Sequence, residues 1–342
     1  MKINHNHFLD LAFNQAEINL GKTKLNPSVG SILVENGSVI SSGVTSINGR
    51  PHSETNTLNN NVKYKKASLY ITLEPCTHHG LTPPCTDLIQ KKNIKNVYYC
   101  FNDPDKRTYK KAKKILKKNK IQIKQLSYRK YKNFYKSYFI NKKNNLPFIS
   151  AKIAISKDFY TITNYHSRKI VHLIRSQYDC IISTSKSINK DNSLLNCRLN
   201  GMNRSKPDLF IIDLNFKLKK KLILTKLNKN RKTYIITSST DIKKELLYKK
   251  LHFKIIRVKS LNTNTDFEIL FKKLFKLGYG RILFETGLTF LNTLIKKKIL
   301  NKIHFFQSNK KLCQKGLNND TPIYLKRLSL KKRINVNLFG DK

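Results

Sequence analysis

Residues Thr72–Cys85 read TLEPCTHHGLTPPC and, together with His52-Ser53-Glu54 upstream, they decide how the first part of this chain folds. One histidine and two cysteines can supply three ligands to a tetrahedral zinc ion, which leaves a fourth position for water. A carboxylate two residues from the histidine can move protons at that position. The motif therefore predicts a zinc site with an open position, typical of a zinc-dependent deaminase.

The predicted local structure supports thiolate ligands at this site. His52 and Glu54 fall in the first turn of one predicted helix, and Cys76 and Cys85 lie around the start of another. Helix N-termini carry free N–H groups and a positive dipole end, which favour a thiolate over a thiol. An alternative is a structural zinc site that uses His78 or His79 as a fourth ligand.

The first part of the chain alternates helices and strands, which is typical of an α/β domain. Asn36-Gly37 separates two apolar runs and is a strong hairpin signal. The spacing predicts helices over 6–20, near His52, and over 86–93, 107–119 and 128–139. It predicts strands over 29–34, 38–44, 68–73, 94–101 and 121–125.

The polar segment 141–147, which ends in Pro147, predicts a domain boundary, so we expect domains over 1–145 and 146–342. Beyond it the alternation resumes and predicts a second α/β domain. Strands are expected over 148–155, 179–184, 208–213, 233–237, 254–258, 281–285 and 302–307. Helices are expected over 167–177, 240–251, 266–277 and 287–297.

The composition narrows the class of protein. The formal net charge is +48, but its basic residues are spread over both halves and there is no Trp, so we interpret the charge as compositional rather than as a nucleic-acid site. No apolar stretch is long enough to cross a membrane, and the polar N-terminus does not resemble a signal peptide. We therefore expect a cytoplasmic protein with a small-molecule substrate and no membrane partner, which could form a homo-oligomer.

Three segments closely resemble one enzyme family. Residues 26–30 (NPSVG), 52–54 (HSE) and 72–85 are similar to the deaminase half of the bifunctional riboflavin-biosynthesis deaminase–reductases. The long stretch from Glu-Pro-Cys to Pro-Pro-Cys distinguishes that family among deaminases. The resemblance implies a cytidine-deaminase-like three-layer domain that deaminates a diaminohydroxyphosphoribosylaminopyrimidine. It also implies that Zn²⁺ is held by His52, Cys76 and Cys85, with Glu54 as the proton donor.

The second domain has no Gly-rich nucleotide fingerprint, but polar residues follow several predicted strands. Glu285-Thr286-Gly287 joins a strand to a helix, where α/β sheets bind ligands. Residues 147–158, 173–176, 191–198 and 284–287 are similar to the reductase half of the same family. The resemblance implies a dihydrofolate-reductase-like fold that uses NADPH to reduce the ribosyl group to a ribityl chain.

The resemblance also implies which residues of the second domain bind ligands. The cofactor would be held by Ile155, Thr161, Thr163, Ser187, Asp191, Gly287, Leu288 and Thr289. The phosphoribosyl substrate would be held by Arg175, Leu195, Arg198 and Glu285. Phe159 stands where the family usually has Gly, and Thr161–Asn164 contains no Trp. Three alternatives follow: a deaminase with an inactive reductase domain, a basic nucleic-acid-binding protein, and a tRNA deaminase.

Overall fold

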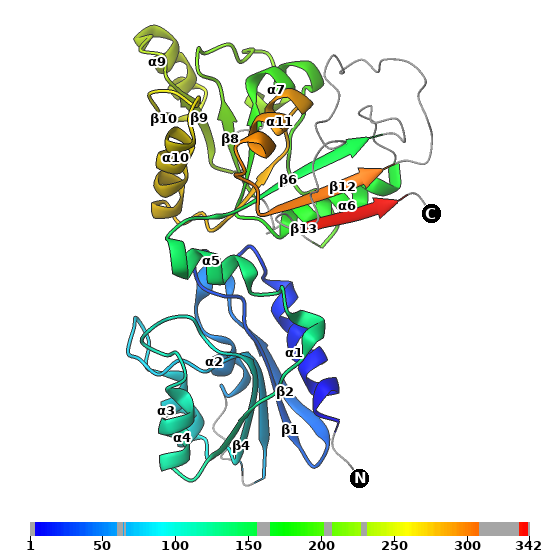
Figure 1. Cartoon of the computed structure of the whole chain (residues 1–342), viewed down its shortest axis with the longest axis vertical. Helices are drawn as coiled ribbons and strands as arrows, with labels where there is room; N and C mark the ends of the chain where they lie inside the picture. The colour runs from blue at the N-terminus through cyan, green and yellow to red at the C-terminus, as the bar shows by residue number, and fades with distance from the viewer. Residues whose placement is uncertain are drawn as a thin grey trace. The chain divides into compact units, whose positions relative to one another are not determined.

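The computed structural model divides the chain into two compact units, Met1–Asn145 and Leu146–Lys342 (Figure 1). It describes residues 4–59, 64, 66–155, 165–201, 207–226, 231–307 and 335–340. Each unit is built around one β-sheet, and both belong to the α/β class that the sequence predicts.

The first unit contains a five-stranded sheet with the order β2-β1-β3-β4-β5. Its strands are β1 (Gly30–Glu35), β2 (Ser38–Val44), β3 (Ser68–Leu73), β4 (Asn96–Phe101) and β5 (Gln122–Gln125). Its helices are α1 (His5–Ile18), α2 (Ser53–Thr57), α3 (Cys85–Lys91), α4 (Ala112–Lys118) and α5 (Lys136–Asn144), with 3₁₀ turns at Ile47–Gly49 and Arg129–Tyr131. The β1–β2 hairpin turns at Asn36-Gly37, where both residues have positive φ.

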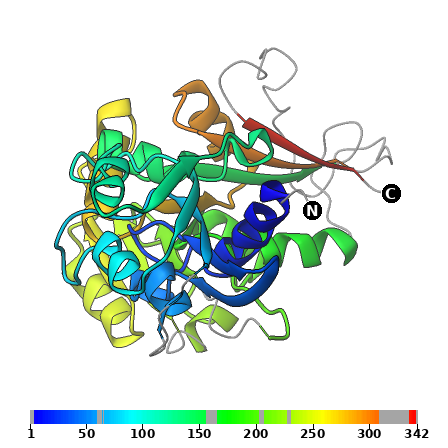
Figure 2. The ribbon, with the colours of Figure 1, turned by 90° about the horizontal axis from the view of Figure 1, so that it is seen from below.

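Gly30 and its neighbour Ser31 show that α1 and α2 pack on opposite faces of this sheet. A Cβ atom at Gly30 would lie 1.9 Å from the carbonyl oxygen of Ala12 in α1. The next residue, Ser31, points the other way, and its hydroxyl lies 2.6 Å from the Thr57 hydroxyl of α2. Figures 1 and 2 show α1 lying along its face of the sheet. The unit therefore has three layers, helix on sheet on helix, as the resemblance implies.

The second unit contains an eight-stranded sheet with the order β10-β9-β8-β7-β11-β6-β12-β13, and neighbouring strands are parallel. Its strands are β6 (Phe148–Ile155), β7 (Cys180–Thr184), β8 (Asp208–Ile212), β9 (Thr233–Thr237), β10 (Lys254–Arg257), β11 (Arg281–Phe284), β12 (Lys302–Gln307) and β13 (Asn335–Gly340). Its helices are α6 (Tyr165–Ser176), α7 (Ser185–Asp191), α8 (Ile223–Lys226), α9 (Ile242–Lys250), α10 (Asn264–Lys276) and α11 (Leu288–Lys296).

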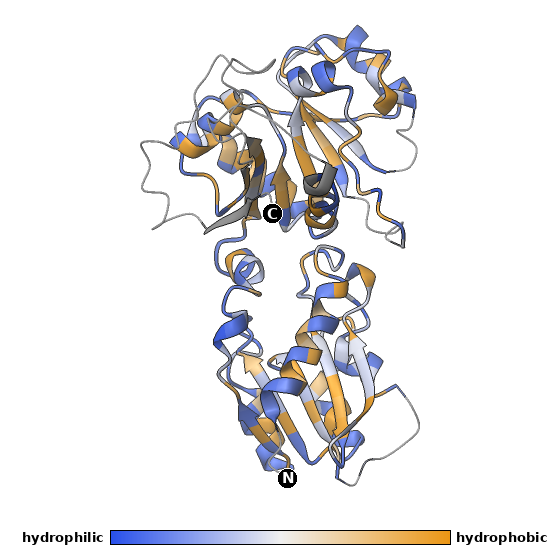
Figure 3. Ribbon diagram, turned by 90° about the vertical axis from the view of Figure 1, so that its right-hand side faces the viewer, coloured by the Kyte–Doolittle hydropathy of each residue, from blue (hydrophilic) through white to orange (hydrophobic). Residues whose placement is uncertain are grey.

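Both faces of this sheet are buried, which explains why its strands read as continuous apolar runs. On β8, Phe210 packs in one hydrophobic cluster with residues of α10 and α11. Its neighbours Leu209 and Ile211 pack in the other cluster, with residues of α6, α7 and α9. Figure 3 shows the apolar residues concentrated along the strands. Parallel strands covered on both faces place their carboxyl ends at one edge, where ligands bind.

Several predicted boundaries are wrong. The segment 141–147 is not a loop throughout, because α5 continues to Asn144 and ends at Asn145 in the left-handed conformation. The helix predicted over 107–119 begins only at Ala112. The helix predicted over 128–139 is a 3₁₀ turn followed by the start of α5. Helices α7 and α8 and strand β13 were not predicted; α7 and α8 are too short for a clear helical period.

Candidate active sites

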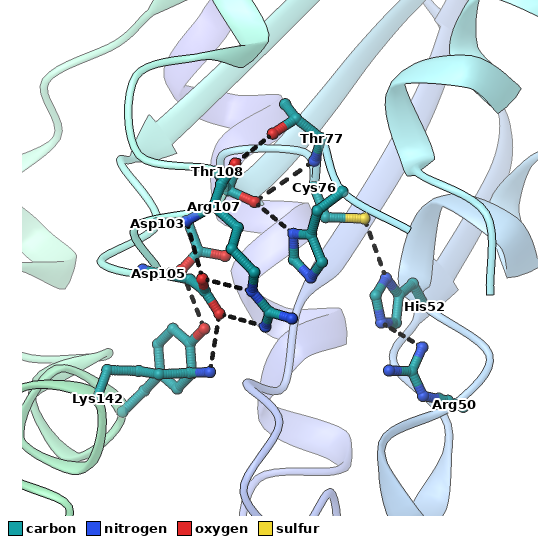
Figure 4. Close-up of polar contacts among 11 residues, drawn as sticks. Arg50, His52, Cys76, Thr77, Asp103, Asp105, Arg107, Thr108 and Lys142 are labelled. Carbon is teal, nitrogen blue, oxygen red and sulfur yellow. Dashed lines mark hydrogen bonds and ion pairs between the residues drawn. The ribbon is translucent and has the colours of Figure 1, made fainter. Parts of the chain in front are cut away.

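Three short segments bring the predicted metal ligands together in the first unit. His52 is the N-cap of α2, Cys76 follows β3, and Cys85 is the first residue of α3. Their potential ligand atoms all lie within 4.8 Å of one another. The imidazole Nδ1 of His52 is 3.6 Å from Cys76 Sγ and 3.4 Å from Cys85 Sγ. Nδ1 is therefore the nitrogen of His52 that faces the thiols (Figure 4).

The charge balance of this cluster fits a divalent cation. The backbone N–H of Cys85 donates to Cys76 Sγ over 3.2 Å, and hydrogen bonds from Cys85 and His52 lower the pKa of the Cys76 thiol. The hydrogen bond with Cys76 and burial raise the pKa of the Cys85 thiol. One thiolate therefore keeps its neighbour protonated, whereas a cation between the two would stabilise both thiolates. Two thiolates and one imidazole are a donor set that zinc prefers.

The two nearby histidines do not complete a four-ligand site. His78 Nδ1 is 3.1 Å from the Thr108 hydroxyl. His79 is exposed and lies 3.9 Å from the Asp87 carboxylate. Within the described ranges, His52, Cys76 and Cys85 form the only group of three or more potential metal ligands. This arrangement leaves the fourth position open, as a catalytic zinc site does and a structural one does not.

The two glutamates near the site lie in different environments. Glu54 is 4% exposed, accepts a hydrogen bond from the Ser53 hydroxyl over 2.9 Å, and has a pKa that is raised by burial. Glu74 accepts backbone N–H groups from Asp103, Lys110 and Ala112. Those bonds tie Glu74 to the loop before α4, so its role is structural. Of the two, Glu54 is therefore the candidate for exchanging a proton.

A network of charged side chains lies beside the cluster (Figure 4). Arg107 donates two hydrogen bonds to Asp105, over 2.9 and 2.7 Å. Lys142 of α5 donates to the same carboxylate over 3.0 Å. Hydrogen bonding to Arg107 and Lys142 lowers the pKa of Asp105. Arg107 and Lys142 therefore share one carboxylate and are both paired within the network.

The second candidate site lies at the carboxyl ends of three neighbouring parallel strands, β7, β11 and β6. Arg175 of α6 and Glu285 after β11 form a buried bidentate ion pair, with distances of 2.6 and 2.9 Å. The structure therefore brings together two of the four predicted substrate residues. Arg175 also donates to the backbone carbonyl of Asn196 over 3.0 Å, which links the pair to the 192–198 loop.

The other two predicted substrate residues lie on that loop. The side chain of Leu195 is buried in a hydrophobic cluster, so only its backbone can contact a ligand. Arg198 is exposed, and its backbone N–H lies 3.3 Å from His172 Nδ1. The side-chain oxygen Oδ1 of Asn196 is buried without a hydrogen-bond partner among the described residues. A ligand hydroxyl could satisfy that acceptor.

The predicted cofactor residues partly converge. The backbone N–H of Gly287 donates to the Ser187 hydroxyl over 3.1 Å. Gly287 is the N-cap of α11 and provides no side-chain cap, so that helix start can receive a phosphate. Leu288 points into the core, Thr289 is exposed, and Asp191 ends α7. Ile155 ends β6, whereas Thr161 and Thr163 lie outside the described residues. The described residues thus fit an anionic cofactor such as NADPH.

Three residues near these sites were not identified from the sequence. Lys152 of β6 is half-buried near the Glu285 carboxylate, and desolvation lowers its pKa. Arg231 is half-buried and donates to the backbone carbonyls of Leu194, Leu195 and Pro207. Arg50 lies beside the metal-ligand cluster. The only sequence signal for Lys152 is a charge inside an apolar strand, and single basic residues carry little information in a chain this basic.

The fold and the clusters define a zinc-type deaminase unit joined to a reductase-type α/β unit. Two family models match the chain: the "Cytidine and deoxycytidylate deaminase zinc-binding region" over residues 2–101 and the "RibD C-terminal domain" over residues 150–323. The riboflavin biosynthesis protein RibD of Buchnera aphidicola (subsp. Baizongia pistaciae) is 31% identical over 322 residues, which cover 86% of this chain and 85% of that protein. RibD of Actinobacillus pleuropneumoniae is 27% identical over 310 residues, which cover 87% of this chain and 82% of that protein.

Solved structures share the fold of the whole chain. A deaminase/reductase from Thermotoga maritima superposes with a TM-score of 0.78 at 23% identity, covering 95% of this chain and 91% of its own. Acinetobacter baumannii RibD superposes with a TM-score of 0.79 at 22% identity, covering 95% of this chain and 92% of its own. The chain belongs to the RibD family of riboflavin-biosynthesis deaminase–reductases.

Family membership confirms the predicted fold class, activity and cofactors. The protein is a bifunctional enzyme that acts in riboflavin biosynthesis by deamination and reduction, and it uses Zn²⁺ and NADPH. The two family models and the RibD relatives do not favour the three alternatives, namely an inactive reductase domain, a nucleic-acid-binding protein and a tRNA deaminase. No helix in the described part of the chain is long and apolar enough to span a membrane.

Proposed function

We propose that residues 1–145 carry the deamination and residues 146–342 carry the reduction, each at the site described above. The main support for this proposal is the cluster of His52, Cys76 and Cys85, whose ligand atoms lie within 4.8 Å of one another. The buried Glu54 lies on the same short helix as the histidine cap. In the second unit, the Arg175–Glu285 pair marks the edge of the sheet where ligands bind.

In the first unit, His52, Cys76 and Cys85 would hold the zinc ion and Glu54 would transfer protons. When bound, zinc supplies the Lewis acidity that makes water a nucleophile near neutral pH. Glu54 would take a proton from the attacking water and give it to the departing amine. Its buried position and raised pKa suit a carboxylate that must be both base and acid near neutral pH.

In the second unit, the ligands would lie along the carboxyl edge of the sheet. The cofactor would be held by Ile155, Thr161, Thr163, Ser187, Asp191, Gly287, Leu288 and Thr289, which include the uncapped start of α11. When bound, NADPH supplies the hydride for reduction of the ribosyl group. Arg175, Leu195, Arg198 and Glu285 would hold and orient the substrate, with the 192–198 loop fixed by Arg231.

We propose a phosphoribosylated pyrimidine as the substrate. The Thermotoga maritima structure is named a diaminohydroxyphosphoribosylaminopyrimidine deaminase and 5-amino-6-(5-phosphoribosylamino)uracil reductase. The same 14-residue segment from Thr72 to Cys85 that forms the metal cluster supports this choice for our chain. Arg107 and Lys142 near that cluster both pair with Asp105 rather than standing free for a polyanion, which supports a small-molecule rather than a nucleic-acid partner.

We further propose that the enzyme works in the cytoplasm, where its cysteines stay reduced. The five cysteines in the described ranges are free thiols, and two of them are needed as zinc ligands. A homo-oligomer is compatible with this function, and nothing in the two sites requires a second chain for the roles given above.

A matched pair of cysteine variants tests the metal assignment. Replacing Cys85 with alanine should lower the zinc content from about one ion per chain to near zero and abolish ammonia release. Cys100→Ala is the control, because Cys100 is also buried but lies in β4 outside the ligand group. Metal analysis and ammonia assays on purified protein would check both results. Full deamination by metal-free Cys85→Ala protein would overturn the assignment.

A further inference from the structure

Arg50 is a cation at the deaminase site without an anionic partner. Its Nη1 atom donates to the Thr82 hydroxyl over 2.8 Å and lies 3.4 Å from Nε2 of His52. The side chain is only partly exposed. Among the described residues no carboxylate pairs with Arg50, whereas Arg107 nearby is neutralised by Asp105. A partly buried guanidinium that lacks a counter-charge is a strong attractor for an anion.

The contact between Arg50 and His52 gives a second, independent reason to expect an acceptor here. His52 presents Nδ1 to the cysteine thiols, so a metal bound through Nδ1 leaves the imidazole proton on Nε2. The guanidinium has N–H donors and no acceptor. Two donors would then face each other on the edge of His52 that points away from Cys76 (Figure 4). A shared acceptor between or beside them would satisfy both.

The surrounding loop holds the guanidinium in place. Thr82 belongs to the segment between the two cysteines, and a Cβ at Gly80 of the same segment would lie 3.5 Å from Nη2 of Arg50. On the other side, the Asn26 side chain donates to the carbonyl of Gly49 over 3.1 Å, which fixes the turn before Arg50. The charge is therefore positioned next to the metal cluster by both flanking segments, rather than extended into solvent.

We propose that Arg50 binds the phosphate of the phosphoribosyl substrate in the deaminase site, and so selects phosphorylated substrates. This proposal rests on the assignment of the metal cluster to deamination of a phosphoribosylated pyrimidine. The reacting ring would lie at the open metal position, and its phosphoribosyl arm would reach past His52 to the guanidinium. The planar fork of arginine matches two phosphate oxygens, while Thr82 holds the fork in orientation.

The test compares Arg50 variants on the phosphorylated substrate and on the same compound without its phosphate. For Arg50→Ala we expect KM for the phosphorylated substrate to rise about 10- to 100-fold, the effect of losing a hydrogen bond to a charged group. The value of kcat should change little, and KM for the dephosphorylated compound should stay near that of the unmodified enzyme. Arg50→Lys should recover part of the loss, because it keeps the charge but not the fork.

Controls separate this role from a structural one and from failure of the proposed function. Arg129→Ala removes an exposed arginine of a 3₁₀ turn and should change neither KM. Zinc content is measured for every variant, and Arg50→Lys carries the test if Arg50→Ala does not fold. Equal losses on both substrates, or no loss on either, would overturn the phosphate role. If the unmodified enzyme did not deaminate the pyrimidine at all, the proposed function would fail instead.

Discussion

At the residue scale, the candidate deaminase site combines three types of side chain: an imidazole, two thiols and a carboxylate. A histidine cap and two cysteines form the ligand group, and Glu54 lies beside it, buried at 4% exposure. Glu74 lies within the Thr72–Cys85 motif itself, but its oxygens accept three backbone N–H groups. Environment, and not residue type, therefore separates the two carboxylates and supports the proposal that Glu54 exchanges protons.

Replacing Glu54 with glutamine tests that distinction. The amide keeps the size of the side chain but cannot accept a proton, so we expect the rate of ammonia release to fall about 10²- to 10⁴-fold. Zinc content should remain near one ion per chain, because Glu54 is not one of the ligands. Glu17→Gln on the exposed face of α1 is the control and should have full activity. Unchanged ammonia release by Glu54→Gln would exclude its catalytic role.

The site residues that the sequence predicts lie in local motifs, whereas the residues that it does not predict are defined by contacts made on folding. His52, Glu54, Cys76 and Cys85 lie in two short motifs whose spacing is itself informative. Arg50 and Arg231 depend on contacts made by folding, such as the bonds from Arg231 to the carbonyls of Leu194 and Leu195. In a chain with 68 Lys and Arg residues, no single basic side chain could have been selected from the sequence.

At the element scale, the sheet edges place the functional residues. The hairpin, the order of helices and strands, and most strand boundaries could be predicted, because their patterns are local. The short helix α7 could not be predicted from the sequence, and neither could β13, which pairs with β12. The strand order β7-β11-β6 depends on long-range pairing, and it is this order that brings Thr184, Glu285 and Ile155 to one edge. The turn at Glu285 could therefore be selected from the sequence, but its role with Arg175 in holding the substrate was predicted only through resemblance.

Gly43 of β2 tests how closely α2 must pack for deamination. A Cβ there would lie 2.6 Å from the carbonyl oxygen of Ser53 and 2.8 Å from the backbone nitrogen of Thr57, so α2 would have to move. We expect Gly43→Ala to destabilise the first unit by about 1–3 kcal/mol and to lower its deaminase activity, since α2 carries Glu54. Thermal unfolding and ammonia release measure the two effects.

The exposed neighbour Ser42 provides the control for that variant. Ser42→Ala also changes a residue of β2 but adds no atom against α2, so it should leave stability and activity nearly unchanged. A Gly43→Ala protein as stable and as active as Ser42→Ala would contradict the packing argument.

The Asp179 carboxyl, which lies just before β7 and caps the turn before β11, should make the second unit less stable as the pH rises. Asp179 accepts the backbone N–H groups of Gly280 and Arg281 over 2.7 and 2.8 Å, and burial raises its pKa to about 7. A carboxyl whose folded pKa exceeds its unfolded value stabilises fully below the unfolded pKa, here 3.8, and loses that contribution as pH rises to about 7. The shift corresponds to at most about 4 kcal/mol.

Asp179→Asn isolates this contribution, because the amide oxygen can still accept both N–H groups but does not ionise. Urea unfolding of the second unit at pH 4.5 and pH 8 should show a larger loss of stability for the unmodified chain than for the variant. The same pH dependence in both proteins would show that Asp179 does not titrate in this window.

At the scale of the whole molecule, the chain joins two α/β units of different architecture. The first has a mixed five-stranded sheet, and the second has an eight-stranded sheet with parallel neighbours. Each unit has its own hydrophobic clusters and its own candidate site. A deamination that releases ammonia and a reduction that consumes NADPH therefore need no shared residue. It follows that a variant of one site should leave the other reaction intact.

The most direct test follows ammonia release and NADPH oxidation separately in Glu54→Gln and Glu285→Gln proteins, alone and mixed. We predict that Glu54→Gln releases ammonia about 10²- to 10⁴-fold more slowly but oxidises NADPH normally when it is given the deaminated compound. We predict that Glu285→Gln, once its fold is verified by circular dichroism, releases ammonia but oxidises little NADPH, and that the mixture completes both reactions. Loss of both activities in folded, zinc-containing Glu54→Gln protein, or ammonia release that depends on Glu285, would contradict two separate sites.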